Sequence, residues 1–454
     1  MGDHRSGPAL KPVLGLGAVT FIAVGMTIGG GVFIFTGITL KITGKALPLA
    51  YMLAVVPVFV AMMPLAMLGA TIPTTGGNYR YPSRMVSPGL AFVGIWTYAL
   101  ASFFGQIPLY ALGCARYVQA VVPGVHENLF AVGLVTFFLV VNYFGVQLAA
   151  RVQGVLVVIL CSALLCYAAT GTANFHPEHF NGFFERGEGN LLLATALLTF
   201  TYLGANGVIE LGGEIRNPEK TIPRAFFISI PLVAVIYAGV AVATVGVLPL
   251  DRLTAADEPL LLVSQAIFSR TGALLFILCG AVLALTSTLN ALFIFGTKSL
   301  LMMVADGLLP GVFGRIHPRY KTPHILLAVL WGLSVLGIFS GFSLETLASY
   351  AALGGLMVFL PTLLAALRLK ACYPEAYERS TFRFRGAGLW ICCLTGMGLI
   401  TFFMVVLVVD LKSVWRIGCF FLFVASGIVF YRLRKKTLIA RGEDPERYIK
   451  HPRP

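Results

Sequence analysis

A run of glycines interrupts the first long apolar segment of the chain. The residues are Gly25-Met26-Thr27-Ile28-Gly29-Gly30-Gly31-Val32-Phe33. Each glycine costs an α-helix about 1 kcal/mol relative to alanine and adopts backbone angles that other residues avoid. The run therefore predicts a break in a helix. The freed N–H groups at the start of the second half-helix can bind an anion, and the carbonyls that end the first half-helix can bind an ammonium group or another cation.

A second interruption lies in the apolar segment at 191–213. Its residues are Phe200-Thr201-Tyr202-Leu203-Gly204-Ala205-Asn206-Gly207. Asparagine and glycine are poor helix formers, and Asn206 can offer its side-chain amide to a ligand. Close packing between helices is the alternative explanation for small residues at both places, such as the Gly25-x-x-x-Gly29 spacing.

Two carboxylates follow the second interruption. Glu210 lies about one turn beyond it and Glu214 lies four residues further, which places both on one helical face. Ionisable groups in apolar segments are costly and usually functional. We therefore expect Glu210 to titrate. For Glu214 we expect either an ion pair with Arg80 or Arg84 in a gate, or a purely structural position at the end of a helix.

A cluster of hydroxyls at Thr286, Ser287 and Thr288 offers oxygen ligands for a sodium ion. The alternative is that each hydroxyl bonds to the preceding turn of its own helix. No histidine lies in the middle of an apolar segment, so a histidine proton relay is not expected. The sequence leaves a proton and a sodium ion open as coupling ions and predicts no cofactor.

These residues are embedded in an unusually apolar chain. Of its 454 residues, 58% are hydrophobic and 11% are charged, whereas soluble domains have about 45–50% apolar and about 25% charged residues. A membrane-spanning helix needs about 20 mostly apolar residues. The sequence predicts an all-α membrane protein with twelve transmembrane helices. The twelve apolar segments lie near 13–40, 47–71, 89–118, 129–147, 152–171, 191–213, 224–249, 271–304, 323–340, 345–367, 387–409 and 413–431.

The interruptions fall in the first and the sixth of these segments. Gly-interrupted helices at matching positions of two halves are typical of transporters built from inverted repeats. The predicted repeats are residues 13–171, with helices 1–5, and residues 191–367, with helices 6–10. Helices 11 and 12, at 387–431, lie outside the repeat.

The net charge of +14 reflects 33 basic and 19 acidic residues. Most of the basic residues lie in loops on one side of the predicted membrane, which the positive-inside rule assigns to the cytosol. We expect a cytosolic stub at 1–12, a basic cytosolic tail at 432–454 and location in the plasma membrane. This charge suits anionic lipid headgroups better than nucleic acid.

Four motifs in order resemble an amino acid permease of the amino acid–polyamine–organocation superfamily. They are TIGGGVF at 27–33, IPTTGGNYRY at 72–81, GEIRNPEKTIPRA at 213–225 and MMVADGLLPGVFGRIHPRYKTPH at 302–324. The resemblance covers about 13–325. It implies a fold of ten helices in an inverted repeat plus two more, and transport of amino acids or related amines by alternating access.

The resemblance also implies positions for the substrate. Its carboxylate would lie against the backbone of Ile28, Gly29, Gly30 and Gly31, and its amine near the carbonyls of Gly25, Met26, Phe200 and Leu203. Its side chain would face Leu203, Gly204, Asn206 and residues of segments 3 and 8.

The chain departs from its relatives at two places. Several relatives have a lysine midway along helix 5, whereas Leu160 is expected at that place here. The family's Arg-Asp-Gly after helix 8 is Ala305-Asp306-Gly307, and we expect an ion pair at the cytosolic end to be lost with the arginine.

The leading prediction is a secondary active carrier for an amino acid of small to medium size. The alternative is a polyamine or other organic-cation carrier of the same fold, for which Glu210 is the one acidic candidate. No catalytic constellation is visible, and the glycine run lacks the Lys-Ser/Thr of a nucleotide-binding loop. An enzyme, an ion channel and an ATP-driven pump are therefore disfavoured. The oligomeric state is left open.

Overall fold

The computed structural model describes residues 14–449 except 120–121, 145, 321 and 385. It describes the side chains of these residues except 146–153, 214, 294–295 and 447–448. The predicted stub at 1–12 and the last five residues of the tail lie outside the described residues.

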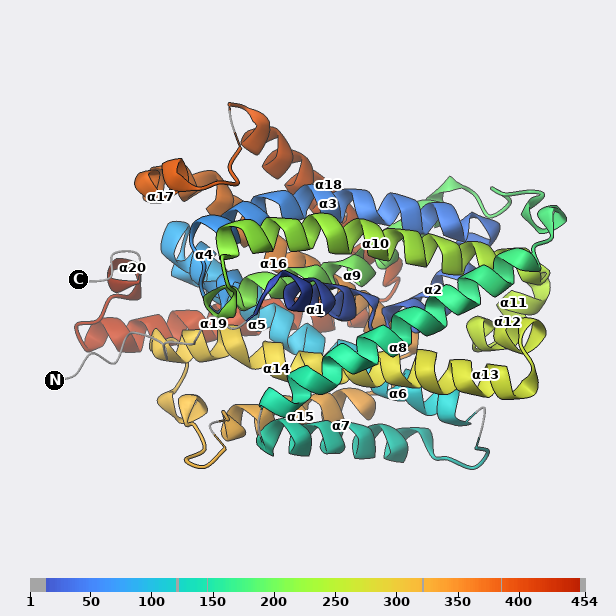
Figure 1. The fold of residues 1–454 in the computed structure, drawn as a ribbon. Coiled ribbons are helices and arrows are strands. Elements are labelled where there is room, and N and C mark those ends of the chain that lie inside the picture. Colours follow the sequence, from blue (N-terminus) through green and yellow to red (C-terminus); the bar gives the residue numbers. More distant parts are fainter. Residues whose placement is uncertain (1–13, 120–121, 145, 321, 385, 450–454) are drawn as a thin grey trace.

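The described residues form helices and two isolated β-bridges, which join Leu14 to Ile215 and Thr75 to Leu211. Figure 1 shows the helices as a bundle of mostly long, roughly aligned segments. The first part of the chain forms α1 (Leu16–Ile28), α2 (Gly31–Thr43), α3 (Leu47–Thr71), α4 (Gly77–Met85), α5 (Pro88–Leu100), the π-helix η2 (Ala101–Gln106), α6 (Ile107–Gln119), α7 (Glu127–Phe144) and α8 (Val146–Ala173). The middle part forms α9 (Glu188–Tyr202), the 3-10 helices η4 (Leu203–Glu210) and η5 (Gly212–Glu214), α10 (Pro218–Val247), α11 (Leu250–Ala255), α12 (Pro259–Ile267), α13 (Arg270–Phe276), the π-helix η6 (Ile277–Val282) and α14 (Leu283–Ala305). The last part forms α15 (His324–Ile338), α16 (Leu344–Cys372), α17 (Pro374–Arg379), α18 (Gly388–Asp410), α19 (Val414–Ala440) and α20 (Pro445–Tyr448).

Ten helical stretches among the described residues are long and apolar enough to cross a membrane. One of them, Leu16–Thr71, has 56 residues and contains α1, α2 and α3, while α15 is a shorter apolar helix of 15 residues. The chain is thus a multi-pass α-helical membrane protein, as predicted. The count of twelve spans and the inverted repeat stay predictions.

The first predicted break is present. Helix α1 ends at Ile28, α2 begins at Gly31, and Gly29 between them has an extended ψ of −159°. The second break has a different form from the prediction. After α9 the chain continues as the 3-10 helices η4 and η5, so an α-helical second half is absent there.

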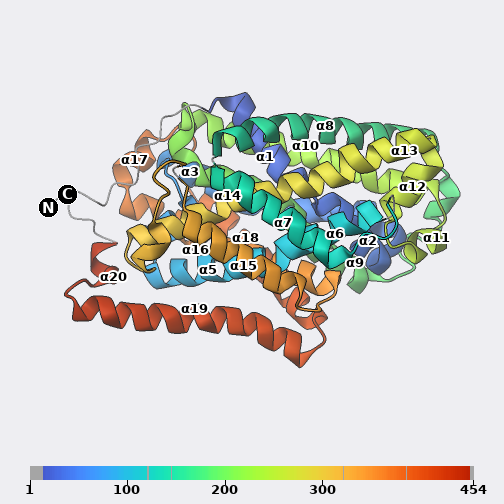
Figure 2. The same ribbon diagram turned by 90° about the horizontal axis from the view of Figure 1, so that it is seen from below.

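The interrupted helices lie inside the bundle. In an 18-residue apolar window of the stretch Glu188–Glu210, which contains α9, 83% of the residues are buried, whereas in the corresponding window of α19 only 17% are. Figure 2 shows α19 along the outer flank of the bundle. Helix α19 runs on to Ala440, past the predicted end of the last segment at 431, so the first part of the predicted tail is helical.

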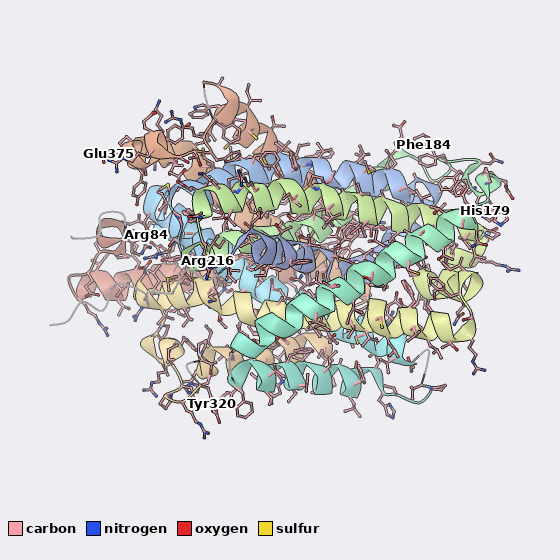
Figure 3. All side chains as sticks on the ribbon, viewed as in Figure 1. Arg84, His179, Phe184, Arg216, Tyr320 and Glu375 are labelled. Carbon is pink, nitrogen blue, oxygen red and sulfur yellow. The ribbon has the colours of Figure 1, made fainter. Side chains whose placement is uncertain are left out.

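The bundle has two distinct ends. Helices α4, α17 and α20 lie at one end, which we call the α4 end, and α11 and α12 lie at the other, the α12 end (Figure 1). Arg84, Arg216 and Glu375 lie toward the α4 end, while His179 and Phe184 lie at the α12 end (Figure 3). The two breaks lie between these ends.

Candidate substrate site

The two breaks pack directly on each other. A Cβ atom on Gly204 of η4 would lie 2.2 Å from the carbonyl oxygen of Met26, and one on Gly207 would lie 1.9 Å from Cε of Met26. The contact at Gly204 is with backbone atoms and is incompatible with a side chain, whereas the contact at Gly207 is with the movable tip of the Met26 side chain. Glycine at position 204 therefore allows η4 to approach the end of α1 so closely.

Two side chains from other helices satisfy polar groups of the first break. Thr288 of α14 accepts a hydrogen bond from the backbone N–H of Gly30 at 2.7 Å, and Tyr237 of α10 donates to the carbonyl of Thr27 at 2.7 Å. An unpaired backbone group in an apolar interior is costly. These bonds explain how a break can persist at this depth of the bundle.

The residue of α8 that packs on the first break is Val157. A Cβ atom on Gly25 would lie 2.1 Å from Cγ2 of Val157. Leu160, which we expected in place of the relatives' lysine, is also buried. The described part of α8 thus presents an apolar side chain to Gly25.

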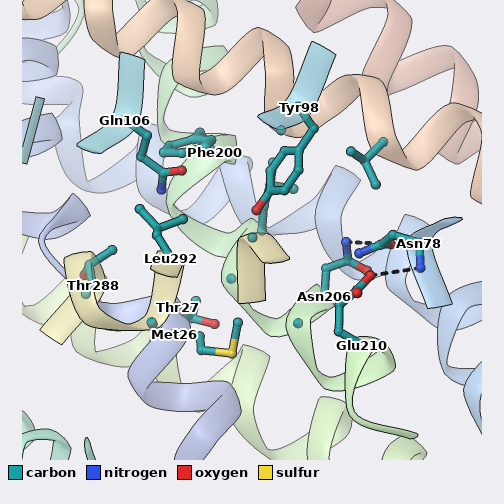
Figure 4. Close-up of a pocket in the computed structure, with 18 of the residues that line it drawn as sticks. Met26, Thr27, Asn78, Tyr98, Gln106, Phe200, Asn206, Glu210, Thr288 and Leu292 are labelled. Atoms are coloured by element: carbon teal, nitrogen blue, oxygen red, sulfur yellow. Dashed lines mark hydrogen bonds between the residues drawn. The ribbon is translucent and has the colours of Figure 1, made fainter. Parts of the chain in front are cut away.

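A cavity of about 100 Å³ lies beside the breaks (Figure 4). Its wall is mostly apolar and comes from α1, α2, α4, α5, η2, α6, α9, η4, α14 and α16. Polar atoms enter from several of these elements. The lining residues include Met26, Gly29, Gly31, Asn78, Tyr98, Gln106, Phe200, Leu203, Gly204, Asn206, Glu210, Leu292, Ser299 and Gly355.

Most of the predicted substrate residues line this cavity. They are Met26, Gly29, Gly31, Phe200, Leu203, Gly204 and Asn206. Gly25, Ile28 and Gly30 are buried nearby and are not part of the lining. Gly25 packs on Val157, and Gly30 gives its N–H to Thr288.

Glu210 lies at one end of the cavity and is 4% exposed. Its Oε1 accepts the backbone N–H of Asn78 at 3.0 Å, and the hydroxyl of Ser299 lies 3.1 and 3.0 Å from its two oxygens. Asn206 donates its Nδ2 to Oδ1 of Asn78 at 3.0 Å. Figure 4 shows Asn78, Asn206 and Glu210 side by side at this end. A single buried carboxylate thus connects η4, α4 and α14.

An ion pair lies beyond Glu210, toward the α4 end of the bundle. Arg84 binds both carboxylate oxygens of Asp306, with Nη2 to Oδ1 at 2.8 Å, and Tyr79 donates to Oδ2 at 2.7 Å. Burial and the neighbouring Asp306 carboxylate raise the pKa of Tyr79 well above its usual range. The expectation that Ala305 removes an ion pair here was wrong, because Arg84 of α4 supplies the cation.

The predicted partners of Glu214 have other contacts. Arg84 binds Asp306, and Nη1 of Arg80 donates to the hydroxyl of Thr74 at 2.8 Å. The side chain of Glu214 lies outside the described residues.

The three hydroxyls proposed for sodium all bond within α14. Thr286 donates to the carbonyl of Val282 at 2.7 Å, while Ser287 and Thr288 each donate to that of Ala284 at 2.9 Å. This is the alternative arrangement considered for them. Thr288 alone lines the cavity among the three.

Sequence reasoning missed several residues of the site. Asn78 lies inside the IPTTGGNYRY motif but had no assigned role. Ser299 and Asp306 lie about three and five turns after the hydroxyl cluster, and Gln106 ends the π-helix η2, a type of turn that often occurs at functional sites. Polar residues in otherwise apolar segments are the sequence feature that could have identified them as site residues.

Interrupted helices around a central cavity, in a bundle of apolar helices, define the class as a multi-pass membrane transporter. The amino acid permease family model matches residues 18–442. The chain therefore belongs to the amino acid permease family, within the amino acid–polyamine–organocation superfamily.

The chain is similar to transporters that are named for different substrates. It is 24% identical to the branched-chain amino acid permease BcaP of Bacillus subtilis, over 81% of this chain and 83% of that protein. It is 27% identical to the methylthioribose transporter of the same organism, over 80% and 82%. It is 25% identical to the vacuolar cationic amino acid transporter 4 of Arabidopsis thaliana, over 84% and 66%. The substrates in these names differ too much to identify one for this chain.

Proposed function

We propose that the protein is a secondary active carrier that moves an amino acid across the plasma membrane by alternating access. The observation that carries this proposal is the crossing of the two breaks beside a central cavity, where Gly204 lies against the carbonyl of Met26. A zwitterion suits such a place. The start of α2 offers N–H groups to a carboxylate, and the end of α1 offers carbonyls to an amine.

The proposed substrate position follows the cavity lining. The carboxylate lies at Gly29 and Gly31, and the amine lies near the carbonyls of Met26 and Phe200. The side chain then extends between Leu203 and Leu292 toward Asn206. In this arrangement helices 1–5 and 6–10 form the inverted repeat, twelve helices cross the membrane, and the α4 end faces the cytosol. Both termini of the chain are proposed to be cytosolic.

Proton coupling through Glu210 is the proposed energy source. Its carboxylate lines the cavity and also holds Asn78 of α4, near the Arg84–Asp306 ion pair. A change in its protonation would therefore act on the substrate cavity and on the α4 end together. Sodium coupling through Thr286, Ser287 and Thr288 is the second possibility, and uptake that is unchanged when choline replaces sodium would eliminate it.

A polyamine or other organic-cation carrier is the second candidate function. The buried carboxylate of Glu210 at the cavity favours it, because a cation without a carboxylate could bind there. The two candidates differ in their need for the substrate carboxylate. Amino acids should compete for uptake in the first case, whereas only amines lacking a carboxylate should compete in the second.

The test uses the full-length protein in proteoliposomes. A panel of labelled amino acids and polyamines is offered under a proton gradient, a sodium gradient and counter-substrate loading in turn. Saturable uptake of at least one amino acid supports the proposal. Uptake of polyamines alone would favour the second candidate.

A further inference from the structure

The cavity ends in a hydrogen-bond acceptor that has no partner. Asn206 lines the cavity and is only 9% exposed. Its Oδ1 is buried and makes no hydrogen bond in the structure. Buried polar atoms nearly always have a partner, since leaving one unpaired costs stability. An unpartnered oxygen in a binding cavity indicates that a ligand supplies the donor.

The surroundings fix the orientation of the Asn206 amide. Asn78 donates its backbone N–H to Oε1 of Glu210 at 3.0 Å, which holds Asn78 against the end of η4. Oδ1 of Asn78 is then directed to Asn206 and accepts its Nδ2 at 3.0 Å. This leaves Oδ1 of Asn206 as the amide atom without a hydrogen-bond partner in the structure.

The rest of the wall is mostly apolar, and Tyr98 and Gln106 add polar groups to it. Gly29 and Gly31 lie at the break, whereas Phe200, Leu203 and Leu292 contribute the apolar sides. Asn206 and Glu210 lie at the far end, and both present oxygen acceptors. An amino acid with an aliphatic stem and a donor at its tip matches this order.

We propose that Asn206 selects amino acids whose side chain ends in an N–H donor, namely an amide, an ammonium or a guanidinium group. The substrate donates a hydrogen bond from its side-chain tip to Oδ1 of Asn206. A purely aliphatic side chain of the same length would leave this oxygen unpaired and bind more weakly. The inference rests on the proposed function, because it assumes that an amino acid occupies the cavity.

The test compares ligands that differ in the donor. Binding of labelled or competing glutamine, citrulline, lysine and norleucine is measured with purified full-length protein in detergent. Norleucine has the stem of lysine without its terminal nitrogen. We expect at least one donor-bearing amino acid to bind tenfold or more tightly than norleucine. Glutamine and citrulline against lysine separate a neutral donor from a charged one.

Three variants make the test specific. In Asn206→Leu the affinities for donor-bearing amino acids should fall to the level of norleucine, and Asn206→Asp should retain the preference for donors and shift it toward lysine. Thr195→Val is the control, because Thr195 is buried in α9 and bonds only to the carbonyl of Leu191 in its own helix. It should keep the wild-type preference. Size-exclusion profiles and melting temperatures show whether each variant is folded.

Two results would overturn the inference. Norleucine that binds as tightly as every donor-bearing amino acid would contradict it while leaving the proposed function intact. A donor preference that survives Asn206→Leu would assign the selection to another group. If no amino acid binds at all, the proposed function itself fails together with the inference.

Discussion

Asn78 donates its backbone N–H to Oε1 of Glu210 over 3.0 Å, which joins the start of α4 to the end of η4. The carbonyl of Glu210 accepts the N–H of Gly76 at 3.2 Å, so the two segments are joined twice. Glu210 lines the cavity, and α4, which begins beside Asn78, also contains Arg84. We therefore expect a displacement of η4 to move α4 as well.

We expect Glu210→Gln to abolish proton-driven accumulation of substrate. Glutamine cannot ionise, and its amide nitrogen would face the donors of Asn78 and Ser299. Uptake into proteoliposomes with an imposed pH gradient should fall to the level without a gradient. Glu375→Gln, at an exposed position of α17, is the matched control and should accumulate substrate as the wild type does. Accumulation by Glu210→Gln that still follows the pH gradient would remove Glu210 from the coupling mechanism.

Gly204→Ala should disturb the site because the added methyl group would clash with the backbone of α1. Its Cβ would lie 2.2 Å from the carbonyl oxygen of Met26, so η4 must move away from α1. Overpacking of this kind costs about 1–3 kcal/mol, and we expect a lower melting temperature and loss of substrate binding. Gly332→Ala in α15 is the control, because nothing lies within 4 Å of its Cβ position. Equal behaviour of the two variants would contradict the proposed contact.

The Arg84–Asp306 ion pair should show energetic coupling in a double-mutant cycle. The two side chains are 19% and 13% exposed, so solvent screens them only in part. Arg84→Gln and Asp306→Asn should each destabilise the protein, and the double variant should lose less than the sum. The expected coupling is about 0.5–3 kcal/mol, measured by thermal or chemical unfolding in detergent. Additive effects would mean that the two residues act independently.

Glu258, just before α12, should make stability depend on pH. Burial raises the pKa of its carboxyl from 4.5 to about 7, although the Tyr117 hydroxyl and Arg116 act in the opposite direction. The folded state therefore keeps a proton that the unfolded chain loses between pH 4.5 and pH 7. The stabilisation is fully present below pH 4.5 and is lost as pH rises through 7, by up to about 3 kcal/mol.

The measurement is the melting temperature between pH 4.5 and 8. In wild type the contribution of Glu258 lowers the melting temperature as pH rises through this window. Glu258→Gln, which is neutral at every pH, should flatten that part of the profile, whereas Glu375→Gln should leave it as in wild type. An identical profile for Glu258→Gln and wild type would show that Glu258 has an ordinary pKa in the folded protein.

The course of the chain was predictable wherever composition alone decides it. Runs of about 20 apolar residues marked the spans, and three consecutive glycines marked the break between α1 and α2. The form of the second break was not predictable. Glycine is needed at position 204 because the backbone of Met26 lies against it, and a contact between residues so far apart in sequence leaves no local pattern.

The sequence did not predict which side chains from different helices contact each other. Asp306 lost the arginine that precedes it in relatives, but Arg84 from another helix binds it. Asn78 and Ser299 each lie in segments with their own helical pattern, and only the fold brings them to Glu210. A carboxylate in an apolar segment was enough to predict a functional role for Glu210. Its hydrogen-bond partners could be identified only from the three-dimensional structure.

Counterflow tests the central claim most directly, because it needs no assumption about the coupling ion. Proteoliposomes are loaded with an unlabelled amino acid mixture, and trace labelled amino acid is added outside. We predict transient accumulation of label by the wild type and by Gly332→Ala, and none by Gly204→Ala, in which the crossing of the two breaks is disturbed. Failure of the wild type to exchange any amino acid would contradict the account, as would undiminished exchange by Gly204→Ala.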